Sequence, residues 1–151
     1  MHVSTAEVLL LVAHVFATTA MVGLIWFVQI VHYPLFTAVG RDGFDRYAQQ
    51  HQHLTSFVVG PFMAVEGVTA LWIAIDPPAG LNRWFAFGAL AVLGVVLGST
   101  VLLQVPRHAV LAHGYDDRRA RSLVRTNWIR TIGWTARGLM AAVMLVLAVT
   151  G

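Results

Sequence analysis

Four long segments of this chain contain almost no charged residue, and the polar side chains in each fall mainly on one helical face. The segments are residues 8–31, 54–75, 84–105 and 132–149. Each is close to or above the roughly 20 apolar residues that an α-helix needs to cross a bilayer core. We therefore predict an all-α fold, a four-transmembrane-helix bundle in up-down-up-down order, whose polar faces meet in the interior.

Composition supports a membrane protein. Apolar residues make up 58% of the chain and charged residues 11%, whereas soluble proteins average about 25% charged residues. The short connections leave room for a single integral membrane domain, residues 1–151. The chain has no cysteine, which excludes disulfides, thiolate metal sites and iron–sulfur clusters.

The arginine distribution predicts the orientation. All ten basic residues are arginine, and the first and third connections with their flanks hold most of them. On that side lie Arg41, Arg46, Arg107, Arg118, Arg119, Arg121 and Arg125, against Arg83 on the other. Cytoplasmic connections are enriched in basic residues, so we expect both termini outside and both Arg-rich connections in the cytoplasm. Membrane topology thus accounts for the excess of basic residues, and we expect no nucleic-acid partner.

Local signals predict where the helices begin and bend. Ser4 and Glu7 form the pattern of a capping box, which predicts a first helix that starts close to Thr5. That helix should end near residue 33, before Pro34, and Pro106 should bend or interrupt the third helix. Residues 45–75 as a helix would be about 45 Å long, against a hydrocarbon thickness of about 30 Å. We therefore expect the helices to extend on the cytoplasmic side.

The polar residues fall into two layers. Counted from the outer helix ends, His14, Glu66 and Arg137 lie at about 13 to 18 Å, and Arg130 shares a helix face with Arg137. A lone charge at this depth costs about 3 kcal/mol or more, so it is a hypothesis for a functional site. Glu66 and Arg137 are either a buried ion pair that fixes helix register or part of a proton or substrate path. His14 is either a hydrogen-bonded core histidine or a ligand.

The second layer lies at about 33 to 42 Å by the same count. It contains Gln29, His32, His51, Gln104, His108 and Asn127. Three imidazoles from three helices can bind Zn, Cu or Fe and leave a coordination position open. Gln29 and Gln104 can hydrogen-bond the metal-bound rings and set their orientation. Two histidines can instead hold haem b. The alternative is that these histidines are solvated residues at the headgroup boundary.

Two stretches resemble a known kind of protein. They are Trp26 to Phe36, with Gln29 and His32-Tyr33-Pro34, and Thr126-Asn127-Trp128-Ile129-Arg130-Thr131. Both are similar to stretches in small four-span bacterial membrane proteins without an assigned activity, which implies a multi-pass protein of the bacterial inner membrane. The layout also resembles histidine-bearing four-helix membrane oxidoreductases and copper-resistance membrane modules. That second likeness is one of fold and transfers no residue roles.

These observations leave three functional hypotheses. The first is a metal- or haem-dependent protein that acts on a lipophilic small molecule or an electron. The second is a proton-coupled small transporter that works as a dimer, with Glu66 titrating. The third is a non-catalytic membrane subunit. All three place the protein in contact with the lipid bilayer.

Overall fold

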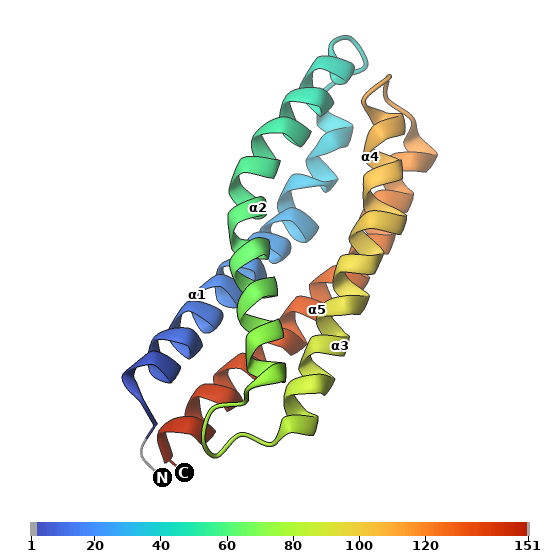
Figure 1. Cartoon of the computed structure of the whole chain (residues 1–151). Coiled ribbons are helices and arrows are strands. Elements are labelled where there is room, and N and C mark those ends of the chain that lie inside the picture. Colours follow the sequence, from blue (N-terminus) through green and yellow to red (C-terminus); the bar gives the residue numbers. More distant parts are fainter. Residues whose placement is uncertain (1–2, 151) are drawn as a thin grey trace.

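The computed structural model describes residues 3–150, and every regular element in this range is helical (Figure 1). The predicted all-helical class with four long apolar helices is confirmed. The elements are α1 (Thr5–Phe27), η1 (Val28–His32), η2 (Pro34–Ala38), α2 (Phe44–Ile75), α3 (Arg83–Ser99), η3 (Thr100–Gln104), α4 (Val105–Leu111) and α5 (Asp117–Thr150).

Side-chain caps set the helix starts. The Ser4 hydroxyl accepts from the backbone N–H of Glu7 at 3.3 Å, and the Glu7 carboxylate accepts from the Ser4 N–H at 2.8 Å. This is the predicted capping box, and α1 begins at Thr5. Asn82 caps α3 by accepting from the N–H of Trp84 at 2.8 Å. Such caps satisfy N–H groups that have no partner within the helix.

Two helices pass their prolines instead of ending at them. The π-helical turn η1 ends just before Tyr33 and Pro34, and the π-helical turn η3 ends just before Val105 and Pro106. In each, the residue before the proline donates its N–H to the carbonyl five residues back. The first helical path therefore runs on through η2 to Ala38, beyond the predicted end near residue 33. Proline lacks an N–H and crowds the preceding turn, and a widened turn is where a helix absorbs such a disturbance.

The chain folds back on itself three times. The α2–α3 connection lies at the same end of the molecule as the start of α1 and the end of α5 (Figure 1). Residues 39–43 and 112–116 form the connections at the opposite end. Two glycines let α5 approach its neighbours closely: a Cβ at Gly133 would collide with Val96, and one at Gly138 would lie 3.0 Å from Cγ2 of Val22.

The interior alternates between apolar and polar layers. An apolar cluster that includes Leu11 and Met144 fills the end near the start of α1, and a second one around Trp134 fills the middle. A third cluster around Phe36 and Leu123 fills the end with the connections 39–43 and 112–116. Glu66, Arg137 and His14 of the first layer are almost completely buried, whereas His32, His51 and His108 of the second layer are only partly buried.

The outer surface is apolar. Phe57, Val68, Leu102 and Leu139 each expose about two-thirds of their surface, at 67%, 67%, 73% and 67%. Monomeric soluble proteins rarely expose contiguous apolar areas of this kind. Four helical segments within the described residues are long and apolar enough to span a membrane, namely Thr5–Ala38, Phe44–Ile75, Arg83–Leu111 and Asp117–Thr150. Together these features suggest a multi-pass membrane protein.

Candidate functional site

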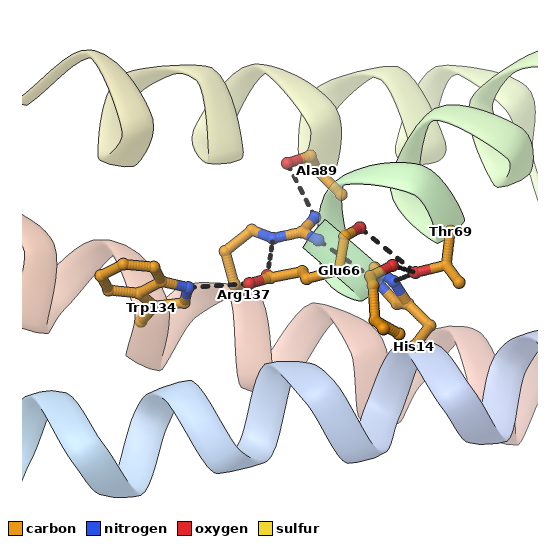
Figure 2. A network of polar contacts seen from close by, with 7 residues as sticks. His14, Glu66, Thr69, Ala89, Trp134 and Arg137 are labelled. Atoms are coloured by element: carbon orange, nitrogen blue, oxygen red, sulfur yellow. Dashed lines mark hydrogen bonds and ion pairs between the residues drawn. The ribbon is translucent and has the colours of Figure 1, made fainter. Parts of the chain in front are cut away.

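An ion pair lies in the middle of the bundle (Figure 2). Nε of Arg137 on α5 donates to Oε1 of Glu66 on α2 at 3.0 Å, and both side chains are almost completely buried. The indole N–H of Trp134 donates to the second carboxylate oxygen at 2.9 Å. Both oxygens of Glu66 therefore have a donor, as a buried carboxylate requires.

The remaining nitrogens of Arg137 also have partners. Nη1 donates to the backbone oxygen of Ala89 on α3 at 2.9 Å, and Nη2 lies 3.2 Å from Nε2 of His14 on α1. Nδ1 of His14 lies 2.7 Å from the hydroxyl of Thr69 on α2 (Figure 2). One guanidinium thus connects all four helical columns. Both carboxylate oxygens of Glu66 and all three nitrogens of Arg137 thus have partners within the network. None of the residues in the network lines the cavity described below.

The three histidines of the second layer lie together. Nε2 of His32 is 2.8 Å from Nδ1 of His51, and the rings of His51 and His108 have centroids 5.5 Å apart. Nε2 of His108 is 2.7 Å from the hydroxyl of Tyr33. Thr55, one turn along α2, places its hydroxyl 3.1 Å from Nδ1 of His51. The result is two hydrogen-bonded pairs, His32 with His51 and Tyr33 with His108, whose rings lie next to one another.

Tyr33 belongs to this cluster, although the predicted second layer did not include it. It is only 4% exposed, and its hydroxyl bonds a ring 75 residues away in the chain. Its position next to Pro34 and the turn η1 aims it inward. A π-helical turn has no periodic sequence signature, so only the neighbouring proline signalled a change of direction here.

The arrangement differs in detail from a three-histidine metal centre. Within residues 3–150, no group of three or more His, Cys, Asp or Glu side chains is placed to hold a metal ion. His32 and His51 use one ring nitrogen each on one another, and His108 uses Nε2 on Tyr33. These nitrogens are engaged in hydrogen bonds instead of converging on one point.

The amide side chains expected to orient the histidines bond other groups. Oε1 of Gln29 accepts from Nδ2 of Asn127 at 3.0 Å, and its Nε2 donates to the backbone oxygen of Val124 at 3.2 Å. Nε2 of Gln104 donates to the hydroxyl of Thr126 at 3.0 Å. These bonds fasten η1 and η3 to α5, because each glutamine lies in a π-helical turn and reaches across to that helix.

Arg130 lies between the two polar layers. Its Nη1 donates to Oδ1 of Asn127 at 3.1 Å, and its guanidinium carbon lies 5.2 Å from the centroid of the Trp134 ring. A cation over an indole face is attracted by the ring quadrupole. The same indole donates to Glu66. Trp134 is therefore the link between the buried ion pair and Arg130.

A cavity of about 340 Å³ lies beside the histidine cluster. Its polar wall includes Tyr33, His51, Gln104, His108 and Arg130. Its apolar wall consists mainly of α1 and η1 side chains with one contribution each from α2 and α4: Met21, Leu24, Ile25, Val28, Val59 and Val105. Cavities of this size, mostly apolar with a few convergent polar groups, are typical of small-molecule sites.

The cavity opens sideways between α2 and the η3–α4 segment. Ser56 and Val105 line it and are exposed, Val105 at 56%. Toward the connections at residues 39–43 and 112–116, Gln52 donates to the backbone oxygen of His108 and Gln49 to that of Ala112, each at 3.1 Å. These two bonds join α2 to α4 on that side. The side between α2 and the η3–α4 segment at Ser56 and Val105, which faces outward from the bundle, stays open.

Comparisons of the chain with protein-family models, with curated proteins and with solved structures find no match. The function must therefore be argued from the geometry of the cavity and of the side chains around it.

Proposed function

We propose that this protein is an integral membrane protein of the bacterial inner membrane that binds a lipophilic small molecule between α2 and the η3–α4 segment. The observation that carries the proposal is a cavity of about 340 Å³ with an apolar wall on one side and Tyr33, His51 and His108 on the other. A molecule held there has its apolar body against α1 and its polar end against groups that transfer protons.

The insertion that we propose places the helices across the bilayer in up-down-up-down order, with both termini outside. The seven-to-one arginine asymmetry then places the cavity toward the cytoplasmic side. The mouth at Ser56 and Val105 would face lipid, so that a lipophilic molecule could enter without passing through water. Burial of the mouth in the bilayer is also consistent with its apolar surroundings.

The chemistry that the site supports best is proton transfer to or from the bound molecule. His51 and His108 line the cavity, and each is linked by a hydrogen bond to a further group, His32 and Tyr33 respectively. An imidazole positioned in this way serves as general acid or base. His32 and Tyr33, the hydrogen-bond partners of these imidazoles, would supply or remove the proton.

The test uses protein reconstituted in nanodiscs of zwitterionic lipid and a neutral fluorescent probe, 2-naphthamide. Saturable binding above that of empty nanodiscs is expected. Val59→Phe, which adds volume inside the cavity, should weaken binding by at least about tenfold. Val58→Phe, on the neighbouring position that is 48% exposed and does not line the cavity, should not. Equal binding by the two variants would contradict the proposal.

Metal or haem binding is a second candidate, favoured by the proximity of His32, His51 and His108. Elemental analysis and an absorption spectrum of the purified protein test it. If the three rings bind a metal, His51→Ala should remove most of it, whereas His53→Ala, on an exposed side chain of the same helix, should not. A protein without metal and without a haem band would exclude this candidate.

The transporter hypothesis receives less support. Glu66 accepts from both Arg137 and Trp134 and has no contact with the cavity. A carboxylate held in this way stabilises the bundle, and releasing it for a transport cycle would leave a buried guanidinium without its anion.

A further inference from the structure

We propose that the cavity selects a lipophilic oxyanion, such as a carboxylate, phenolate or enolate, and that Arg130 binds the negative oxygen. This inference rests on the proposed function and adds the chemical class of the ligand. It starts from the charge of Arg130 and from two polar atoms that no protein group satisfies.

Arg130 is a buried cation without a buried anion. Its side chain is only 8% exposed, yet within residues 3–150 the two salt bridges are Glu66 with Arg137 and Arg41 with Asp117. Its polar contacts are with the Asn127 amide and the Tyr33 hydroxyl, neither of them a carboxylate, and its guanidinium lies over the Trp134 ring. Burial of a charge is costly unless an opposite charge or several hydrogen bonds compensate it.

Arg137 on the same helix differs from Arg130 in its hydrogen-bond partners. Arg137 lies seven residues from Arg130 on α5 and is also buried, at 1% exposed, but its Nε donates to Glu66 and its other two nitrogens have partners as well. Nε of Arg130 is buried and has no protein hydrogen-bond partner. The chain therefore supplies a carboxylate to one guanidinium and leaves the other, the one that lines the cavity, without one.

A second unsatisfied atom belongs to another residue of the cavity wall. Gln104 is 1% exposed and lines it, and its Oε1 has no donor, because the amide nitrogen is the atom that bonds Thr126. Buried acceptors of this kind normally have a partner. A guanidinium without a carboxylate partner in the cavity wall favours a ligand that offers a negatively charged oxygen. The unmet acceptor of Gln104 leaves room for a donor on the same ligand and does not require one.

The apolar wall determines the rest of the ligand. Met21, Ile25 and Val59 surround the part of the cavity away from the polar groups and can accept a ring or a short hydrocarbon chain. An inorganic anion would meet the charge of Arg130 but leave this apolar wall unfilled. The complete cavity is therefore complementary to an amphipathic weak acid in its ionised form.

Two probes of the same shape test the inference, 2-naphthoate and 2-naphthamide, measured in nanodiscs of zwitterionic lipid. Charge-assisted hydrogen bonds are stronger than neutral ones, so naphthoate should bind the wild-type protein at least about tenfold more tightly than naphthamide, a difference of about 1.4 kcal/mol. Arg130→Gln should reduce that ratio to about one or below. Arg125→Gln, on an exposed side chain of the same helix, should leave it unchanged.

Two further variants keep the test decisive if Arg130→Gln does not fold. Gln104→Glu adds a negative charge inside the cavity and should weaken naphthoate far more than naphthamide, whereas Arg130→Lys should retain part of the preference. An unchanged ratio in Gln104→Glu, or equal wild-type affinity for the two probes, would overturn the oxyanion inference and leave the proposed function standing. If neither probe binds above empty nanodiscs, the proposed function itself fails.

Discussion

Neutralising one member of the central ion pair should destabilise the protein strongly. Glu66→Gln leaves the Arg137 guanidinium, which is 1% exposed, without its anion, and Arg137→Gln leaves the fully buried Glu66 carboxylate in the same position. Breaking a buried pair by removing one partner costs about 3 to 5 kcal/mol. Each single variant is therefore expected to lose about this much unfolding free energy.

The double variant should lose less than the sum. With both charges gone, the amide side chains can bond one another. The interactions that remain lost are the hydrogen bonds to Ala89 and to His14, at about 1 to 2 kcal/mol each. The double variant should therefore lose about 2 to 4 kcal/mol, against about 6 to 10 kcal/mol if the single effects were additive.

The assay is a reversible SDS titration in mixed micelles, followed by circular dichroism at a helix wavelength so that changes near Trp134 do not distort the signal. The matched control is Arg125→Gln, which removes a positive charge from an exposed position of α5. It should change the unfolding free energy by less than about 0.5 kcal/mol. Additive losses in the Glu66 and Arg137 cycle would refute the energetic coupling derived from the 3.0 Å contact.

Three further predictions address packing, capping and orientation. Gly133→Ala should lower the unfolding free energy by about 1 to 3 kcal/mol because the new methyl collides with Val96; an equal loss in a Val96→Ala background would show that this contact is not the cause. Ser4→Ala should cost about 1 kcal/mol through loss of the capping box, measured in the same SDS titration, and no change would mean that α1 does not depend on it. A C-terminal alkaline phosphatase fusion should be active and a C-terminal fluorescent protein fusion dark, since the arginine asymmetry places the C-terminus outside; the reverse result would contradict the orientation.

The fold class was accessible from sequence because its signals are long and local. Uninterrupted apolar runs between turn residues predict helices without knowledge of their partners. The cap at Ser4 and Glu7 likewise needs only four consecutive residues, and α1 begins where it predicts. The depth count brought Glu66 and Arg137 to the same level because helical rise is constant, and the two side chains are in contact.

The details of the second layer were not accessible from sequence. Helical wheels assume 3.6 residues per turn, and the π-helical turns η1 and η3 change that angle next to the predicted residues. Gln29 and Gln104 lie inside these turns and reach α5 instead of the histidine rings. Tyr33, just past η1, points inward for the same reason.

The cavity itself has no sequence signature. It forms where side chains of four helical segments fail to fill the space between them, which depends on their relative rotation and not on any one segment. Arg130 and His108 could be named as polar residues on inward faces. The lack of a partner for Nε of Arg130 depends on where Asn127 and Trp134 lie in the folded bundle, which the sequence does not specify.

The most direct test of the central claim is photolabelling in nanodiscs with a small neutral lipophilic diazirine, mapped by mass spectrometry with and without excess 2-naphthamide. The proposed binding site predicts labelling of cavity-lining residues such as Met21, Ile25 and Val59 that naphthamide abolishes. Labelling at exposed residues of the outer surface, such as Leu102 and Leu139, should persist, because naphthamide does not compete there. Labelling confined to the outer surface, or cavity labelling that naphthamide leaves unchanged, would contradict a ligand-binding cavity.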